Sequence, residues 1–236
     1  MRELRSAFAL AAAAVVVFCG LSVASPANRA GTASLESIQR QMDEASKNFR
    51  SLSAEVERTK VTVVVNDRST ESGSIRVRGD KMLLELKAGE GEARTVLRNG
   101  DNLYLYNPGL KRVEEYNLGK HRALVEEFLL LGFGTSGKDL RKAYRVALVG
   151  EPVLESKKTV ELELTPKSAA VKKQIAKVNL WLDASTMMPV QQEFHETGSG
   201  DYSIVRYSHV AENVAIPESV FKAHWPKGTQ KIKEQE

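Results

Sequence analysis

Histidine side chains can ligate metal ions or act as general bases near neutral pH, and the chain has four of them: His121, His195, His209 and His224. None belongs to a His-Glu-x-x-His pattern, which places two zinc ligands on one face of a helix. His195 has glutamates close by at positions 193 and 196, a composition that could bind a metal ion. Neighbouring residues of a strand point to opposite faces, however, so we expect structural or surface roles for these histidines and no metal site.

Motifs for nucleophilic or phosphate chemistry are also absent from the sequence. Gly134-Thr135-Ser136-Gly137 lacks the spacing of the G-x-S-x-G nucleophile turn, and no G-x-x-x-x-G-K-[ST] or G-x-G-x-x-G loop occurs. Carboxylates are abundant, with 30 Asp and Glu, but the sequence does not show which pair would meet as acid and base. We therefore predict that the protein is not an enzyme and uses no cofactor.

The composition is that of a folded protein with one large domain or two small ones. The chain has 236 residues, of which 42% are hydrophobic and 27% charged, and its net charge is +4. The basic residues at Lys172-Lys173 and near the C-terminus are not interleaved with aromatics, so we expect solvated faces and no nucleic-acid partner. A single cysteine excludes a disulfide framework and a cysteine-based zinc finger.

The first 24 residues have the pattern of a secretory signal. Two arginines within Met1–Arg5 precede an uncharged run, Ser6–Ala24, and the small residues at positions 22 and 24 fit a cut after Ala24. An uncleaved anchor is an alternative, because about nineteen apolar residues can span a bilayer. Lipidation of Cys19 is a second alternative, which the preceding Phe18 disfavours. In each case the rest of the protein lies outside the cytoplasm.

Residues 25–33 form a small polar linker, and an amphipathic helix follows. Its apolar residues recur at spacings of three and four, the period of one helix face: Leu35, Ile38, Met42, Ala45 and Phe49. Such a stripe belongs either to an ordinary helix packed on a sheet or to a plug over a binding site.

After Ser51 the hydrophobic period changes to two, which indicates β-strands. Val61, Val63 and Val65 continue the alternation, and we expect a polar turn at Asn66–Ser72. About eleven short strands follow at roughly ten-residue spacing without alternating helices, which favours an antiparallel sheet. So many strands in one sheet must curl. The predicted fold is therefore mainly β (α+β), with one strongly curved antiparallel sheet or half-barrel.

One segment, Gly119–Leu140, interrupts the strand pattern. Ala123–Leu131 is predicted to be a short helix that is apolar on most of its circumference, so it is either fully buried or covers an apolar ligand. Phe133 follows between two glycines that permit many backbone conformations, and its position looks exposed.

Several short motifs occur in an order and at a spacing that are more specific than any one of them. The most specific is Leu97–Pro108, which combines a turn, a strand with paired aromatics and an Asn-Pro corner. The others are Leu162–Lys167, Leu180–Asp183, Met188–Val190 and Phe221–Thr229. Together with the helix and the curved sheet, they resemble the periplasmic outer-membrane lipoprotein carrier (LolA-like) family. We expect a single domain at residues 34–232 and a short tail at residues 233–236.

The resemblance implies a half-open β-barrel whose apolar concave face is closed by helices. Carriers of this family accept the acyl chains of a lipoprotein from an inner-membrane ABC transporter and deliver them to an outer-membrane receptor. We thus expect a monomeric carrier in the periplasm that makes and breaks no bond. The alternatives are a carrier of another lipid or glycolipid, a module that senses stray lipids or lipoproteins, and an enzyme with unrecognised carboxylate chemistry.

The resemblance also implies roles for individual residues. Arg78 is the candidate for an arginine that latches the lid, although the Arg-Pro pair common in the family is Arg78-Gly79 here. A phase error of one residue in any strand would exchange its two faces. The expected cavity wall consists of Ile75, Val77, Met82, Leu84, Leu103, Leu105 and Trp181. The expected lid consists of Leu124, Val125, Phe128, Leu129 and Leu131, with Phe133 at its hinge.

Overall fold

The structure is a computed structural model that describes residues 34–119 and 131–233 of the chain. Six strands come first: β1 (Ser51–Thr62), β2 (Asp67–Arg78), β3 (Lys81–Lys87), β4 (Arg94–Asn99), β5 (Asn102–Asn107) and β6 (Arg112–Asn117). The later strands are β7 (Tyr144–Gly150), β8 (Val153–Leu154), β9 (Lys157–Pro166), β10 (Ile175–Asp183), β11 (Pro189–Glu196), β12 (Tyr202–Glu212) and β13 (Gln230–Lys233).

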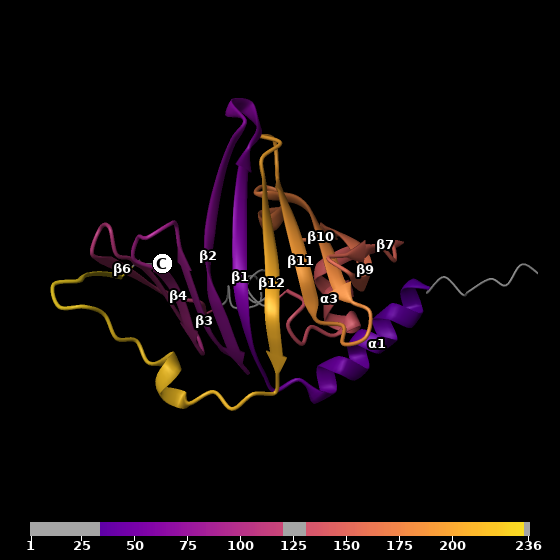
Figure 1. Cartoon of the computed structure of the whole chain (residues 1–236), viewed down its shortest axis with the longest axis horizontal. Coiled ribbons are helices and arrows are strands. Elements are labelled where there is room, and N and C mark those ends of the chain that lie inside the picture. Colours follow the sequence, from indigo (N-terminus) through magenta and orange to yellow (C-terminus); the bar gives the residue numbers. More distant parts are fainter. Residues whose placement is uncertain (1–33, 120–130, 234–236) are drawn as a thin grey trace, which may run out of the picture. The chain divides into compact units, whose positions relative to one another are not determined.

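These thirteen strands of the described residues form one sheet (Figure 1). Twelve of them follow the order β13-β6-β5-β4-β3-β2-β1-β12-β11-β10-β9-β7, and β8 pairs with β9. All pairs among them are antiparallel except β13 with β6. The outermost strands β13 and β7 do not pair with each other within the described residues, so the sheet is open. The predicted curved antiparallel sheet is confirmed. The structure has thirteen strands where about eleven are expected, and two of them, β8 and β13, are short.

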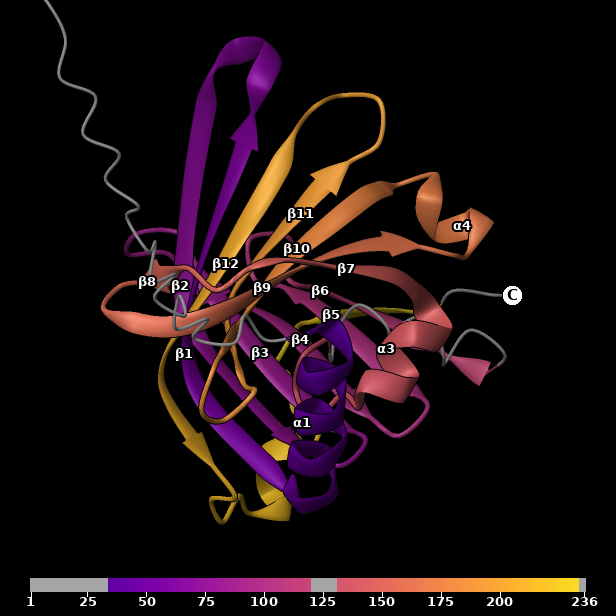
Figure 2. The same cartoon turned by 90° about the vertical axis from the view of Figure 1, so that its right-hand side faces the viewer.

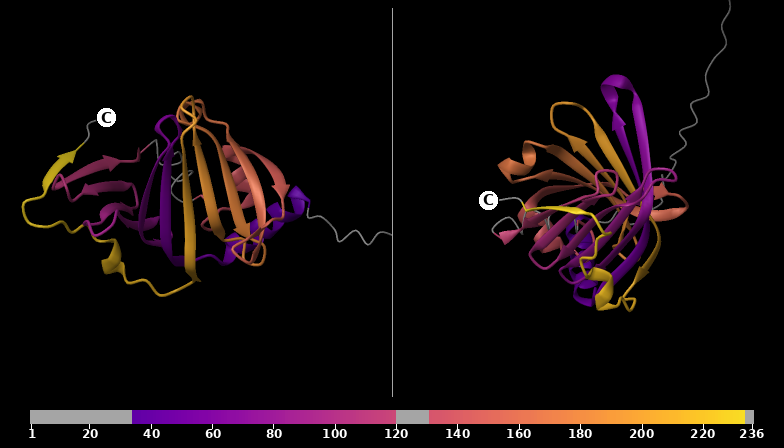
Figure 3. Two further views of the ribbon diagram at one scale, coloured as in Figure 1. Left: turned by 45° about the horizontal axis from the view of Figure 1, so that its top comes forward. Right: turned by 90° about the vertical axis from the view of Figure 1, so that its left-hand side faces the viewer.

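The pairing register aligns alternate residues of neighbouring strands on one face of the sheet. Ile75 of β2, for example, lies opposite Ala54 of β1 and Leu84 of β3. We call the face that carries Ile75 and Leu84 the inner face, and the face that carries the intervening residues the outer face. Inner-face residues from both halves of the sheet, such as Ile75 and Phe194, line the same hollow, so the sheet curves around this face. Figures 2 and 3 show the twisted sheet from the side.

Two helices lie against the inner face of the half formed by β7 and β9 to β12 (Figure 2). Helix α1 (Leu35–Asn48) begins at Ser34, whose Oγ accepts a hydrogen bond of 3.1 Å from the Ser37 amide. Its predicted apolar stripe packs on the sheet, with Ile38 and Met42 buried, as in an ordinary core helix. Helix α3 (Gly137–Ala143) follows the same capping pattern at Ser136. None of the helices in the described part of the chain is long and apolar enough to cross a membrane.

The β1–β2 hairpin differs from the prediction. The expected polar turn at Asn66–Ser72 is wrong, because β2 already begins at Asp67 and the turn is the 3₁₀ segment η1 (Val63–Val65) followed by Asn66 in a left-handed conformation with φ of 49°. The side chains of this turn face solvent, and Val64 is 84% exposed. This end of the hairpin extends past its neighbours (Figure 1), so Asp67–Thr70 of β2 is exposed on both faces, and this polar stretch carries no hydrophobic period.

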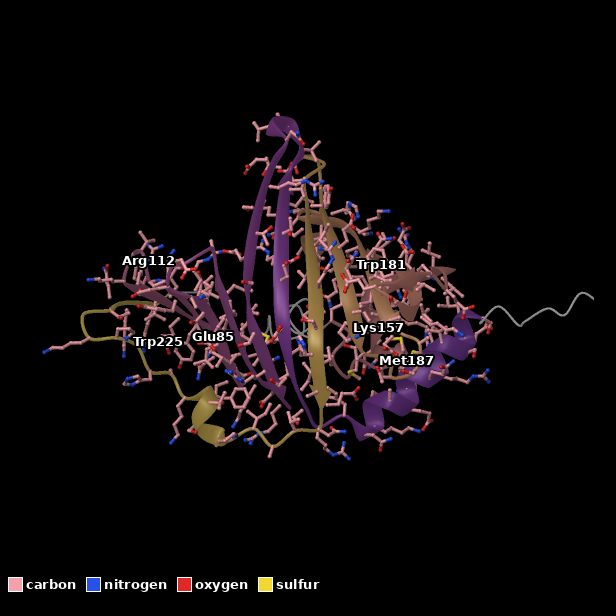
Figure 4. The ribbon with its side chains drawn as sticks, viewed as in Figure 1. Glu85, Arg112, Lys157, Trp181, Met187 and Trp225 are labelled. Carbon is pink, nitrogen blue, oxygen red and sulfur yellow. The ribbon has the colours of Figure 1, made fainter. Side chains whose placement is uncertain are left out.

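The outer face of β3, β4 and β5 is covered by the segment that joins β12 to β13. This segment contains the 3₁₀ turn η3 (Glu218–Phe221), and Phe221 is fully buried against Leu97 of β4. Trp225 stacks on Tyr106 of β5 with ring centroids 5.2 Å apart (Figure 4). The sheet therefore has an apolar layer on both faces, and the hollow that Ile75 and Phe194 line lies on the inner one.

The close approach of α3 to α1 depends on the absence of a side chain at Gly137. A Cβ atom there would lie 2.5 Å from the Gln39 carbonyl oxygen and 2.8 Å from the Gln39 Cα. We predict that Gly137→Val lowers the free energy of unfolding by about 1–3 kcal/mol, because backbone atoms cannot move aside as a flexible side chain would. Gly150→Val is the matched control, since a Cβ at Gly150 meets nothing within 4 Å. Urea unfolding checks both variants, and equal losses of stability would contradict this packing.

Candidate functional site

Two adjoining hollows form a groove on the inner face. One has a volume of about 320 Å³ and lies between β1–β3 and β10–β12. The other has a volume of about 450 Å³ and lies over β3 to β6. Both are lined by Arg58, Leu84 and Leu86, so they lie next to each other, and we call the two together the inner groove. Its apolar lining includes Val56, Ile75, Met82, Val96, Leu105, Ile175, Phe194 and Val205.

Strand pairing explains why these side chains meet. Leu84 of β3 lies opposite Ile75 of β2 and Val96 of β4, and Val96 in turn lies opposite Leu105 of β5. Because alternate residues of each strand share a face, four strands place these apolar side chains in one row across the inner face. The groove is apolar because neighbouring inner-face positions of β2, β3, β4 and β5 all carry apolar side chains.

Most of the predicted wall residues lie on the inner face. Ile75, Met82, Leu84 and Leu105 line the inner groove itself. Val77 has the same orientation but is 1% exposed in the core cluster beside the groove. Leu103 lies on the same face, opposite Arg98.

Trp181 lies on the outer face, so its assignment to the wall is wrong (Figure 4). It pairs with Glu161 and Gln191, whereas its neighbours Leu180 and Leu182 are fully buried on the inner face. Every second residue of β10 points to the inner face and packs under α1, and Trp181 lies between two of these positions, so it points to the outer face.

The predicted lid lies mostly outside the described residues, namely Leu124, Val125, Phe128 and Leu129. Its last residue, Leu131, is described and is buried in the core cluster under α1. Phe133 is also buried, at 5% exposure, and meets the Tyr207 ring edge-on with centroids 5.0 Å apart. The expectation that Phe133 is exposed is therefore wrong, because the glycines beside it direct the chain onto the inner face.

A buried pair of side chains holds this segment on the sheet. The Tyr207 hydroxyl donates a hydrogen bond of 2.9 Å to Gln192 Oε1, and Gln192 Nε2 donates to the Leu131 carbonyl oxygen. Gln192 and Tyr207 also line the inner groove. The chain on the C-terminal side of the predicted lid is thus fixed to the wall of the groove by polar contacts that the sequence did not indicate.

Burial raises the pKa of the Tyr207 phenol far above its ordinary value of 10.0. The folded protein therefore keeps this proton at a pH where the unfolded chain loses it, so the contribution of Tyr207 to stability is complete below pH 10 and declines above it. We predict that Tyr207→Phe costs about 1 kcal/mol near neutral pH through the lost hydrogen bond. The variant should also lose less stability than the original chain between neutral and strongly alkaline pH. Urea unfolding on both sides of pH 10 measures this difference, and parallel pH profiles would contradict it.

Arg78 is not placed to latch a lid over the groove. Its side chain lies on the outer face, donates a hydrogen bond to the Ile216 carbonyl oxygen and pairs with Glu218. Its guanidinium also lies over the Phe221 ring, 5.7 Å from the centroid. Arg78 therefore fixes the segment after β12 on the outer face.

The arginine that is buried on the inner face is Arg98, which the sequence analysis missed. Arg98 is 0% exposed, lies opposite Met82 and Leu103, and donates a hydrogen bond of 3.1 Å from Nε to the Gly100 carbonyl oxygen. The sequence shows Arg98 directly before the Asn99-Gly100 turn and two residues after Val96. Residues two apart in a strand share a face, so Arg98 could have been predicted to lie on the same face as Val96.

The described polar residues offer no arrangement for metal chemistry. Within residues 34–119 and 131–233, no three His, Cys, Asp or Glu side chains come together as a metal site. His195 contacts Glu193, 3.1 Å from Nε2 to Oε1, and stacks on Tyr202. His209 contacts Glu55, and His121 lies outside the described residues. The apolar lining of the inner groove suits it to bind an apolar molecule.

Comparisons with known proteins agree with this architecture. A family model described as that of an uncharacterized protein matches residues 78–212, which is more than half of the chain. No curated protein matches the chain in sequence. An uncharacterized conserved protein from Thermus thermophilus has a similar structure, with a TM-score of 0.55 and 11% identity over 84% of this chain and 98% of that one.

Two further solved structures are similar at lower TM-scores. A LolA superfamily protein from Nitrosomonas europaea has a TM-score of 0.42 and 17% identity, over 82% of this chain and 99% of that chain. The lipoprotein LppX from Mycobacterium tuberculosis has a TM-score of 0.44 and 14% identity, over 78% of this chain and 98% of that chain. The similar structures include a protein of the LolA superfamily, the family that the motifs indicate, and at these identities the similarity concerns the fold alone.

Proposed function

The chain belongs to the family whose model matches residues 78–212, and we propose that it is a carrier that holds the acyl chains of a lipid or lipoprotein in the inner groove. The observation that supports this proposal is the open apolar groove itself. Ile75, Leu84 and Leu105 line its space, and Leu84 and Leu105 are only partly buried. Apolar grooves of this size on soluble proteins are typical of ligand sites.

Physical chemistry gives the groove a clear use. Each CH₂ group that leaves water contributes about 0.8 kcal/mol, so an acyl chain does not leave a membrane for water unprotected. A groove with an open side can accept such a chain and release it again, which a closed core cannot do. The carrier needs no catalytic residue for this task.

Location and partners form the more specific part of the proposal. The signal at residues 1–24 would export the protein to the periplasm, where a monomeric carrier would meet both membranes. By resemblance, the donor would be an inner-membrane ABC transporter and the acceptor an outer-membrane receptor. The expected lid residues, including Phe128, would cover the groove while the carrier moves from the donor to the acceptor. Cargo other than a lipoprotein is the second candidate, and the position of Arg78 on the outer face favours it, because the latch expected for lipoprotein carriage is absent from that position.

Titration of the delipidated protein with a fluorescent fatty-acyl probe tests the proposal. We expect saturable binding that unlabelled lipid displaces. A folded protein that takes up no acyl probe at any concentration would refute carriage in this groove.

A further inference from the structure

One end of the inner groove carries three arginines. Arg58 of β1, Arg94 of β4 and Arg112 of β6 all line the 450 Å³ hollow together with Leu84, Val96 and Leu105. The register places each of them on the inner face, since Arg94 lies opposite Leu86 and Arg112 lies opposite Asn107. Figure 4 shows Arg112 on the β6 side of the sheet.

Two carboxylates accompany these three guanidinium groups. Arg58 Nη1 lies 3.2 Å from Glu71 Oε2, and Arg94 contacts the other oxygen of the same carboxylate. Arg112 contacts Glu114, whose second oxygen accepts a hydrogen bond of 2.9 Å from the Tyr116 hydroxyl. Three positive charges therefore share two negative ones, which leaves this end of the groove with an excess of one positive charge.

The arginines keep capacity for a further anion. Nε of Arg112 is buried and has no hydrogen-bond partner among the described residues, which is rare for a buried donor. The Arg94 side chain is 52% exposed, whereas Glu71 is only 13% exposed. A guanidinium group has five N–H donors, so Arg94 can bind an anion with its remaining donors and keep its contact with Glu71. A guanidinium group also matches the geometry of phosphate oxygens.

We propose that the inner groove selects amphiphiles with a phosphate headgroup, whose acyl chain lies along Ile75, Met82 and Leu84 and whose phosphate lies at Arg58, Arg94 and Arg112. This inference rests on the proposed carrier function and adds the class of cargo. An apolar surface bordered by an excess of positive charge is complementary to a molecule with one apolar and one anionic end.

The test compares two ligands that differ only in the phosphate: a lysophosphatidic acid and the monoacylglycerol of the same chain length. We expect the original chain to bind the lysophosphatidic acid about tenfold more tightly, and added salt should reduce this preference. Inorganic phosphate alone at the same concentration should not displace it, because the acyl chain supplies much of the affinity.

Substitutions of the arginines test whether they cause the preference for lysophosphatidic acid. Arg94→Gln combined with Arg112→Gln should remove it while monoacylglycerol still binds. Glu71→Gln should tighten binding of the lysophosphatidic acid, since it releases two guanidinium groups from a carboxylate. Arg76→Gln is the control, because Arg76 is a similarly exposed arginine on the outer face that pairs with Glu85.

The outcomes separate the two proposals. Equal affinity for both ligands in the original chain, or a preference that survives in the double variant, overturns the headgroup assignment and leaves the carrier function in place. Failure of both ligands to bind overturns the carrier function as well. Displacement by inorganic phosphate alone would assign the arginines to a free anion and also overturn the proposal.

Discussion

Leu84→Asp is expected to weaken acyl binding by at least about a hundredfold, close to 3 kcal/mol, without unfolding the protein. Leu84 lines both hollows of the inner groove and is only partly buried, so in the empty protein an aspartate there stays in contact with water. An acyl chain in the groove would remove that water and leave an unpaired carboxylate against hydrocarbon, which is strongly unfavourable. The titration with a fluorescent acyl probe measures the loss.

Val153→Asp serves as the control for Leu84→Asp. Val153 is 66% exposed on β8 and does not line the groove, so the same added charge should leave binding unchanged. Circular dichroism of both variants verifies that the sheet persists. A folded Leu84→Asp protein that binds the probe as well as the control would mean that the ligand does not occupy this groove.

Leu180→Ala should lower the free energy of unfolding by about 2–5 kcal/mol. Leu180 is 0% exposed in the core cluster that contains Ile38 and Met42 of α1, so its truncation leaves a cavity that the surrounding helix and sheet cannot fill. The neighbouring Trp181 is larger but lies on the outer face and is partly exposed. Trp181→Ala should therefore cost about 1 kcal/mol or less.

Urea unfolding followed by circular dichroism compares these two variants, since the fluorescence of Trp181 is lost in one of them. The order of the two effects is the informative result. If Trp181→Ala destabilises the protein more than Leu180→Ala does, the assignment of the inner face in β10 is reversed.

The sheet could be predicted because its strands carry their own signals. Alternation of apolar and polar residues marks the second half of β2 at Ile75–Arg78, and the Asn99-Gly100 turn fixes the pairing of β4 with β5. Once that register is set, Leu84 and Leu105 fall on the same face, as expected. In β10 the alternation of Val178, Leu180 and Leu182 indicates the phase, whereas Trp181 was assigned to the wall from the resemblance and not from this period.

Other features depend on contacts between distant parts of the chain. The role of Arg78 is set by Ile216 and Glu218, which lie about 140 residues later and cover the outer face. The residues near Arg78 in the sequence do not indicate that this later segment covers the outer face. The start of β2 was misassigned as a turn because Asp67–Thr70 is polar and exposed on both faces, so no apolar alternation marks it as a strand.

Native mass spectrometry of the protein purified from the cells that make it, without detergent, tests the carrier function most directly. We predict a folded chain with a bound acylated molecule, and the mass of that molecule would identify the cargo as a lipoprotein, a phospholipid or a glycolipid. A protein that arrives without any bound molecule and also takes up no fluorescent acyl probe would contradict the carrier function and leave only the fold.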